Sequence, residues 1–348
     1  MHQPTPSGDL RHRTVDAPAG RLHLVEQGSG PLVLLVHGFP ESWYSWRHQL
    51  PVLAAAGYRA VALDVRGYGR SSKPAEVGAY RMRALVEDNL ALVRALGEET
   101  AVIIGHDWGS PIAAVSALVH PEVFRAVGLL SVPYIPPGGP RPSEVFAGMG
   151  GEEEFYISYF QQPGRAEAEI EPDVRGWLAG IYAALSADTT PAPGRPAPTY
   201  VTRGGTMRDR FPTGGLPAWL TEADLDHYAG EFERTGFTGA LNRYRNMDRD
   251  WEDLAGYQGA PLTQPSLFIG GAQDASSTSV SRAIDAHVTT LPGLVSSKLL
   301  DDCGHWIQQE RPQEVNELLI SWLAALPVGT APRYPEPEPV PENGAASR

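Results

Sequence analysis

Short apolar runs bounded by turn residues recur along the chain, and stretches with helical periodicity lie between them. Two helical patterns stand out, Met82–Leu96 and Pro312–Leu326. Apolar runs without alternation are typical of parallel strands, because helices cover both faces of such a sheet. The pattern therefore predicts an α/β fold with a mostly parallel sheet flanked by helices. The predicted strands are Leu32–Val36, Arg59–Leu63, Ala101–Ile104, Ala126–Leu130 and Ser266–Ile269.

The alternation of strands and helices stops between about residues 133 and 257, where aromatic residues, glycine, proline and charge become frequent. Helix-like pieces such as Thr221–Arg234 remain there, and Thr189–Pro198 (TTPAPGRPAP) predicts a surface loop. We interpret residues 133–257 as a mostly helical cap, or lid, inserted between strands of a core made of residues 14–132 and 258–326. Residues 1–13 and the Pro/Glu-rich tail 327–348 are predicted to be disordered.

Composition narrows the classes of function. The formal net charge of −13 argues against a nucleic-acid partner, which requires a basic face. No apolar run is long enough to span a bilayer, and the first residues lack the pattern of a signal peptide, so a cytoplasmic protein is expected. The single cysteine, Cys303, excludes an internal disulfide and a thiolate zinc site. Neither a metal nor an organic cofactor is expected.

The stretch GHDWGS, residues 105–110, follows a predicted strand and precedes a run of small residues typical of a helix. Its pattern G-x-D-x-G has the frame of the nucleophile elbow G-x-S-x-G, in which glycines let a strand and a helix approach around a strained turn. Asp107 stands where that motif has serine. The sequence therefore predicts a carboxylate nucleophile at this turn.

Three further stretches end or follow predicted strands, where open α/β sheets place their ligand sites. They contain the run from His37 to Pro40, Asp274 just past Ile269, and His305 after Lys298-Leu299-Leu300. The order nucleophile, acid, histidine is the one that the α/β-hydrolase scaffold uses for its triad. This order predicts that Asp107, Asp274 and His305 meet in one site.

Each of these residues also has a simpler interpretation. Asp107 is placed to cap the following helix. Asp274 is a candidate for a turn or cap, and Asp301 and Asp302 compete for its role. His305 is a candidate structural histidine, which leaves His37 or His106 as the working one. The stretch Gly67-Tyr68-Gly69 begins like a dinucleotide fingerprint, but its spacing fails.

An aspartate nucleophile selects a particular chemistry. A carboxylate is ionised at neutral pH without a base, and it can displace a leaving group at saturated carbon to form an alkyl ester. His305, oriented by Asp274, is then available to deprotonate the water that hydrolyses the ester. Backbone amides of Phe39 and Trp108 are placed to stabilise the anion that develops. The expected substrate is an epoxide or an alkyl halide.

The leaving group separates these two substrates. An opening epoxide becomes an alkoxide that needs a proton donor, and tyrosine stays protonated at neutral pH. A halide needs only N–H donors. Periodicity leaves open which tyrosine of the predicted cap points inward; the candidates are Tyr134, Tyr156, Tyr159, Tyr182, Tyr200, Tyr228 and Tyr244.

Most of the chain, from about Thr14 to Leu326, resembles the soluble epoxide hydrolases of the α/β-hydrolase fold, including the hydrolase domain of the mammalian enzyme and similar bacterial enzymes. The stretches that carry the resemblance are HGFPESWYSW, DVRGYGRSSKP, GHDWGS, FYISYFQQPG, TGFTGALNRYRNMDRDW and DCGHWIQQERPQEVN. Haloalkane dehalogenases share the first three of them. The fourth and fifth lie in the predicted cap and are characteristic of epoxide hydrolases.

The resemblance implies roles for individual residues. Asp107 is the implied nucleophile, His305 the water-activating base and Asp274 the acid that orients this base, while Tyr156 and Tyr244 match the ring-opening tyrosines. The amides of Phe39 and Trp108 form the implied anion hole, with a cis Phe39–Pro40 bond. Arg243 departs from relatives that carry an aromatic residue there. The predicted substrate pocket includes His37, Pro40, Trp108 and Trp306.

These observations predict an epoxide hydrolase that converts a small apolar epoxide, lipid or aromatic, and water to a vicinal diol. A haloalkane or haloacid dehalogenase with the same aspartate is the nearest alternative. A non-catalytic small-molecule sensor on the same fold is a second one, and a homodimer stays open.

Overall fold

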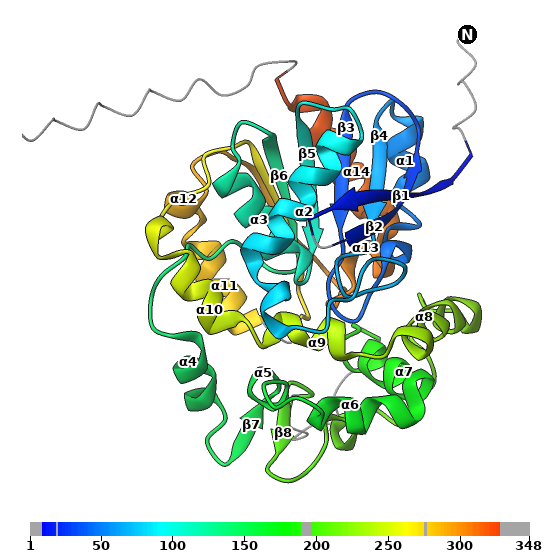
Figure 1. The fold of residues 1–348 in the computed structure, drawn as a ribbon, viewed down its shortest axis with the longest axis vertical. Coiled ribbons are helices and arrows are strands. Elements are labelled where there is room, and N and C mark those ends of the chain that lie inside the picture. Colours follow the sequence, from blue (N-terminus) through cyan, green and yellow to red (C-terminus); the bar gives the residue numbers. More distant parts are fainter. Residues whose placement is uncertain (1–8, 19, 189–196, 275–276, 328–348) are drawn as a thin grey trace, which may run out of the picture.

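The computed structural model describes residues 9–18, 20–188, 197–274 and 277–327. Within them, a mostly parallel eight-stranded sheet has the order β1-β2-β4-β3-β5-β6-β9-β10, and only the β1–β2 and β2–β4 pairs are antiparallel (Figure 1). The bounds are β1 Arg11–Ala17, β2 Gly20–Gln27, β3 Leu32–Val36, β4 Arg59–Leu63, β5 Ala101–His106, β6 Phe124–Leu130, β9 Ser266–Gly271 and β10 Leu294–Leu300.

Helices cover both faces of this sheet. Alternate residues of β3 point to opposite sides, so Leu32, Leu34 and Val36 join one core and Val33 and Leu35 the other. The first core contains residues of α2 and α3, and the second contains residues of α1 and α14. These helices are α1 Leu50–Ala55, α2 Met82–Ala95, α3 Gly109–Val119 and α14 Pro312–Ala325. The predicted parallel α/β architecture is confirmed.

The segment between β6 and β9 is mostly helical and lies in the lower half of Figure 1, away from the sheet. The helix predicted at Thr221–Arg234 is α8, capped by the Thr221 hydroxyl, which accepts from the Asp224 amide. Two short strands that the sequence did not indicate, β7 Glu153–Phe155 and β8 Tyr200–Thr202, pair antiparallel. The helices are α4 Pro142–Met149, α5 Tyr156–Tyr159, α6 Arg165–Ile170, α7 Val174–Ala184, α8 Glu222–Thr235, α9 Thr238–Tyr244 and α10 Met247–Asp253.

The remaining helical elements are short connections. Three α-helices follow the C-terminal strands: α11 Ser277–Asp285, α12 His287–Thr290 and α13 Ile307–Glu310. Five 3₁₀ turns are found among the described residues: η1 Trp43–Trp46, η2 Val77–Tyr80, η3 Glu171–Asp173, η4 Met207–Arg210 and η5 Ala255–Tyr257. No helix in the described ranges is long and apolar enough to cross a bilayer.

The N-terminal prediction was wrong at one point. Residues 11–13 belong to β1 rather than to a disordered end, because this strand pairs with β2 along its whole length. Its outer residues are polar and exposed, so no apolar run indicated a strand. Residues 1–8, 189–196 and 328–348, where a disordered N-terminus, a surface loop and a disordered tail were predicted, lie outside the described residues.

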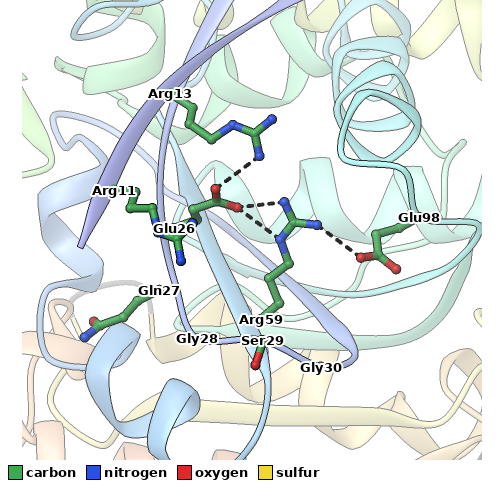
Figure 2. A pocket seen from close by; sticks show the side chains of 9 residues that line it. All are labelled: Arg11, Arg13, Glu26, Gln27, Gly28, Ser29, Gly30, Arg59 and Glu98. Carbon is green, nitrogen blue, oxygen red and sulfur yellow. Dashed lines mark hydrogen bonds and ion pairs between the residues drawn. The ribbon is translucent and has the colours of Figure 1, made fainter. Parts of the chain in front are cut away.

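A cavity of about 390 Å³ lies beside β1 at the amino ends of the parallel strands, away from the carboxyl ends that Asp107 and His305 follow. Figure 2 shows its charged side chains directed toward one another. Glu26 accepts hydrogen bonds from Arg13 and Arg59, and Arg59 also donates to Glu98. These pairs tie β1, β2 and β4 together.

Candidate active site

Asp107 occupies a tight turn between β5 and α3, with a φ of 50°. The glycines at 105 and 109 permit this turn: a Cβ at Gly105 would lie 1.9 Å from the Gly109 carbonyl oxygen, and one at Gly109 1.9 Å from that of Val36. The N-cap residue of α3 is Trp108 rather than Asp107, and the Trp108 side chain makes no capping hydrogen bond. The Asp107 carboxylate therefore lies at the carboxyl edge of the sheet and does not act as a helix cap.

The side chains of Asp107, His305 and Asp274 meet at this edge. The His305 Nε2 atom lies 3.3 Å from Asp107 Oδ2, and His305 Nδ1 lies 3.0 Å from Asp274 Oδ2. The Phe39 amide donates to Asp107 Oδ1 at 2.7 Å, and the Phe39–Pro40 bond is cis. These groups come from four loops, which follow β3, β5, β9 and β10. The loops meet because the carboxyl ends of parallel strands lie at the same edge of the sheet.

The competing residues do not occupy these positions. Asp301 and Asp302 are exposed, and their backbone carbonyls accept from Arg311. The buried His106 ring has both nitrogens occupied by acceptors: Nδ1 bonds Glu41 Oε2 and Nε2 bonds the His305 carbonyl, each at 2.8 Å. Neither nitrogen is available to accept a proton from water.

Charge around His305 sets its protonation. Burial lowers the pKa of this imidazole, but the Asp274 and Asp107 carboxylates outweigh burial and raise the pKa well above its usual value. Both ring nitrogens face a carboxylate oxygen. His305 is accordingly an imidazolium between two carboxylates while Asp107 is ionised.

Beneath these groups, Glu41 links three of the loops. Its carboxylate accepts from the Gly38 amide, the His106 ring and Gln308 Nε2. Burial raises the pKa of Glu41, but the charge of His106 outweighs it and lowers the pKa to about 2. The Glu41–His106 ion pair therefore fastens the turn that carries Phe39 to the loop that carries Asp107.

Two tyrosines face the triad across a cavity. Burial raises the pKa of Tyr156 and of Tyr244, and the Asp107 charge raises both further, so both phenols stay protonated at neutral pH. The Tyr244 ring packs edge-on against Phe39, Trp108 and Tyr156, with centroid distances of 5.3, 5.2 and 5.9 Å. These contacts hold the phenol in the cavity.

The other tyrosines considered differ from this pair. Four of them direct their hydroxyls elsewhere: Tyr134 to the Ala260 carbonyl, Tyr159 to Glu169, Tyr182 to the Pro40 carbonyl, and Tyr228 to Gln309 and Ser45. Tyr200 lines the same cavity as Tyr156 and Tyr244. The sequence did not single it out, because it lies on a three-residue strand without recognisable periodicity.

The cavity has a volume of about 730 Å³ and is lined mainly by apolar side chains. Asp107, Asp274 and His305 lie at one wall, and Arg282 is also part of the lining. The sequence did not identify most of the apolar residues, which are Val132, Val145, Met149, Phe155, Phe160, Ile181, Leu185, Ala197 and Met207. This lining suits an apolar ligand with one reactive polar group.

Of the residues predicted to line the pocket, only Pro40 does so. The buried His37 ring bonds the Gly38 carbonyl and accepts from the Val65 amide. Trp306 packs edge-on behind His305 and donates to the Tyr182 carbonyl. The Trp108 ring packs against Tyr244. These three rings are not part of the lining of the cavity formed by the described residues.

Comparison with known proteins places this arrangement in a family. Residues 31–312 match the model of the alpha/beta hydrolase fold family. The chain is 42% identical over 350 residues to epoxide hydrolase B of Mycobacterium tuberculosis, covering 90% of this chain and 98% of that protein. The protein has the α/β-hydrolase fold.

Two solved structures are close to it. An epoxide hydrolase from an endophytic Streptomyces has a TM-score of 0.88 and 69% sequence identity, covering 90% of this chain and 95% of its own. Epoxide hydrolase A from Mycobacterium thermoresistibile has a TM-score of 0.86 and 44% identity, with 92% and 99% covered. The chain belongs to the epoxide hydrolases of the α/β-hydrolase fold.

Proposed function

We propose that this protein hydrolyses an epoxide to a vicinal diol through a covalent alkyl ester on Asp107. The observation that carries the proposal is the placement of the Asp107 carboxylate and two protonated phenols, those of Tyr156 and Tyr244, on one apolar cavity. The carboxylate supplies the nucleophile, and the phenols supply the proton that an epoxide, unlike a halide, requires.

The first step is alkylation. A carboxylate oxygen of Asp107 attacks an epoxide carbon, the carbon–oxygen bond of the ring breaks, and the leaving oxygen takes a proton from Tyr156 or Tyr244. The products are the hydroxyalkyl ester and a tyrosinate. Because the pKa values of both phenols are raised, each phenol is protonated before this step and can donate the proton that the step consumes.

Ester formation also changes His305. The negative charge of Asp107 is lost, and this charge is one of the causes of the raised pKa of His305. The pKa therefore falls, and the imidazolium proton passes to the tyrosinate. Neutral His305, still oriented by Asp274 at 3.0 Å, is then a competent base.

Hydrolysis is the second step. His305 takes a proton from water, and the hydroxide attacks the carbonyl carbon of the ester. The amides of Phe39 and Trp108 stabilise the tetrahedral anion, which collapses to expel the alkoxide. Transfer of the acid proton of Asp107 to that alkoxide yields the diol and restores the aspartate, the imidazolium and both phenols.

Residues 133–257, which supply Tyr156 and Tyr244, act in this proposal as a cap over a core of residues 14–132 and 258–326. Contacts between the two parts support this division. Tyr182 donates to the Pro40 carbonyl at 2.6 Å, and Tyr244 packs on Phe39 and Trp108. The cap thus reaches the two turns that hold the nucleophile and its anion hole.

A dehalogenase fits the cavity less well. Halide binding favours indole or amide N–H donors, but the three tryptophans of the cap donate elsewhere: Trp177 to Glu169, Trp219 to Ser186 and Trp251 to the Gly139 carbonyl. None of these three rings is part of the cavity lining. A non-catalytic sensor has no need for the complete set of Asp107, Asp274 and His305.

Single turnover in H₂¹⁸O tests the ester mechanism. With enzyme in excess over trans-stilbene oxide, styrene oxide or an epoxidised fatty-acid methyl ester, the first diol should contain no ¹⁸O, and the Asp107 peptide should gain one ¹⁸O atom. A first diol that carries ¹⁸O, with an unlabelled Asp107, means direct attack by water and contradicts the proposal.

A further inference from the structure

Arg243, the residue before Tyr244 in α9, carries a buried positive charge next to the candidate site. Its guanidinium carbon lies 4.7 Å from the centroid of the Trp108 ring. Nη1 donates to the Tyr80 carbonyl at 2.5 Å, and Nη2 pairs with Asp250. The guanidinium is thus fixed in place over the face of an indole.

Stability alone does not account for this cation. Desolvating an ion pair offsets most of its attraction, so apolar side chains of similar volume are often as stable in its place. Arg243 Nε has no hydrogen-bond partner within the described ranges, and Asp250, the partner of its Nη2, is itself buried. Asp250 also accepts from the Met82 amide at 2.6 Å, which fixes it at the start of α2.

Trp108 connects the cation to the ring-opening tyrosines. It follows Asp107 directly, and its ring meets the Tyr244 ring at a centroid distance of 5.2 Å and an angle of 84°. Burial raises the pKa of Tyr244, whereas the neighbouring Trp108 side chain lowers it. The groups therefore follow one another in the order Arg243, Trp108, Tyr244 and Tyr156.

We propose that Arg243 is a positioning residue for ring opening, whose cation holds and polarises the Trp108 indole so that its N–H stabilises negative charge on Tyr244. A cation over the face of an indole withdraws electron density from the ring, which makes the N–H a stronger donor. Tyr244 then gives up its proton to the opening epoxide more readily. This inference rests on the proposed ester mechanism.

Alkylation and ester hydrolysis should respond differently. Alkylation needs the proton from a tyrosine, whereas hydrolysis of the ester relies on His305 and the backbone amides. Loss of the cation should slow the first step alone. Damage to the turn that carries Asp107 and Trp108 should slow both steps, because both steps use that turn.

A matched pair of variants isolates the cation. Asp250→Asn keeps Arg243 and an oxygen for the Met82 amide, while Arg243→Gln/Asp250→Asn removes both charges together. Each is made in the wild-type and the Tyr244→Phe background. Rapid mixing with trans-stilbene oxide, acid quenching and mass spectrometry of the Asp107 peptide give separate rate constants for ester formation and ester decay.

The double variant should form the ester about tenfold more slowly than Asp250→Asn and hydrolyse it at an unchanged rate. In the Tyr244→Phe background the same change should have no further effect, because the tyrosine through which the cation acts is absent. Trp108→Phe, which keeps a ring and the backbone amide but removes the N–H, should reproduce the loss.

Equal slowing of both steps, or the same loss without Tyr244, would overturn the role given to Arg243. An unaltered rate of ester formation in the double variant and in Trp108→Phe would do so too. If the wild-type protein forms no ester on Asp107, the proposed function itself fails. If the ester forms on Asp107 at the wild-type rate in every variant, the role of Arg243 is contradicted, but the proposed ester mechanism is not.

Discussion

The Nε2 atom of His305 lies 3.3 Å from Oδ2 of Asp107, so the base of the proposed second step is paired with the nucleophile of the first. While Asp107 is ionised, the pair favours the imidazolium. Once Asp107 is an ester, one of the charges that hold the proton is gone. The same contact therefore keeps His305 inactive before alkylation and releases it as a base afterwards.

This pairing predicts a pH dependence of stability. The pKa of His305 is raised in the folded protein above its usual value of 6.5, so its contribution is complete below about pH 6.5 and is lost as pH rises through the folded pKa. The free energy of unfolding should therefore decline above pH 6.5 more steeply in the wild-type protein than in His305→Gln. Urea titrations at a series of pH values measure this, and identical slopes would contradict the raised pKa.

The two tyrosines should share the work of ring opening. Because either phenol can donate, Tyr156→Phe or Tyr244→Phe alone should slow ester formation about tenfold to a hundredfold, and the double variant far more. Single-turnover kinetics separate this from ester decay, which should be unchanged. Tyr134→Phe is the matched control, since its hydroxyl bonds the Ala260 carbonyl outside the cavity. Full activity in the double variant would rule the phenols out as donors.

The Glu41–His106 pair should be a major contributor to stability. Removing one partner of a buried ion pair costs about 3–5 kcal/mol, so Glu41→Gln should lower the free energy of unfolding by that order. Folding lowers the pKa of Glu41 from 4.5 to about 2. The free energy of unfolding of the wild-type protein should therefore decrease as pH falls from 4.5 to about 2, and Glu41→Gln should lack the part of this decrease that comes from Glu41. Chemical denaturation at pH 7 and pH 3 tests both effects; a loss below 1 kcal/mol would contradict a buried ion pair.

The turn at Asp107 should tolerate no side chain at its glycines. A Cβ at Gly109 would lie 1.9 Å from the Val36 carbonyl oxygen, which is backbone and cannot move aside. Gly109→Ala should therefore lower stability by more than about 2 kcal/mol and abolish ester formation. Gly148→Ala is the control, because a Cβ there meets nothing within 4 Å. Equal stability of the two variants would mean that the turn is looser than described.

Strands buried on both faces were predictable from the sequence, and strands at the edge were not. β3 and β4 have the predicted bounds, because every residue of β3 and nearly every residue of β4 is buried and apolar. β1 was missed, since its polar residues are held by pairing with β2 and by ion pairs such as Arg13–Glu26. Pairing of this kind leaves no local pattern.

The triad was predictable for a related reason. Residues that follow parallel strands must meet at one edge, so the order of Asp107, Asp274 and His305 was informative. The direction in which each side chain points could not be predicted from this order. Trp306 is adjacent to His305 but turns to the Tyr182 carbonyl behind it, whereas Tyr200, distant in sequence from every motif, reaches the cavity.

The most direct measurement of the central claim is peptide mass spectrometry of His305→Gln after brief exposure to epoxides and to alkyl halides. Without the base, alkylation should proceed and hydrolysis stall, so the Asp107 peptide should gain the full mass of the epoxide, with no adduct in Asp107→Ala. An adduct formed from halides alone would indicate a dehalogenase, and the absence of any adduct on Asp107 would contradict the covalent mechanism.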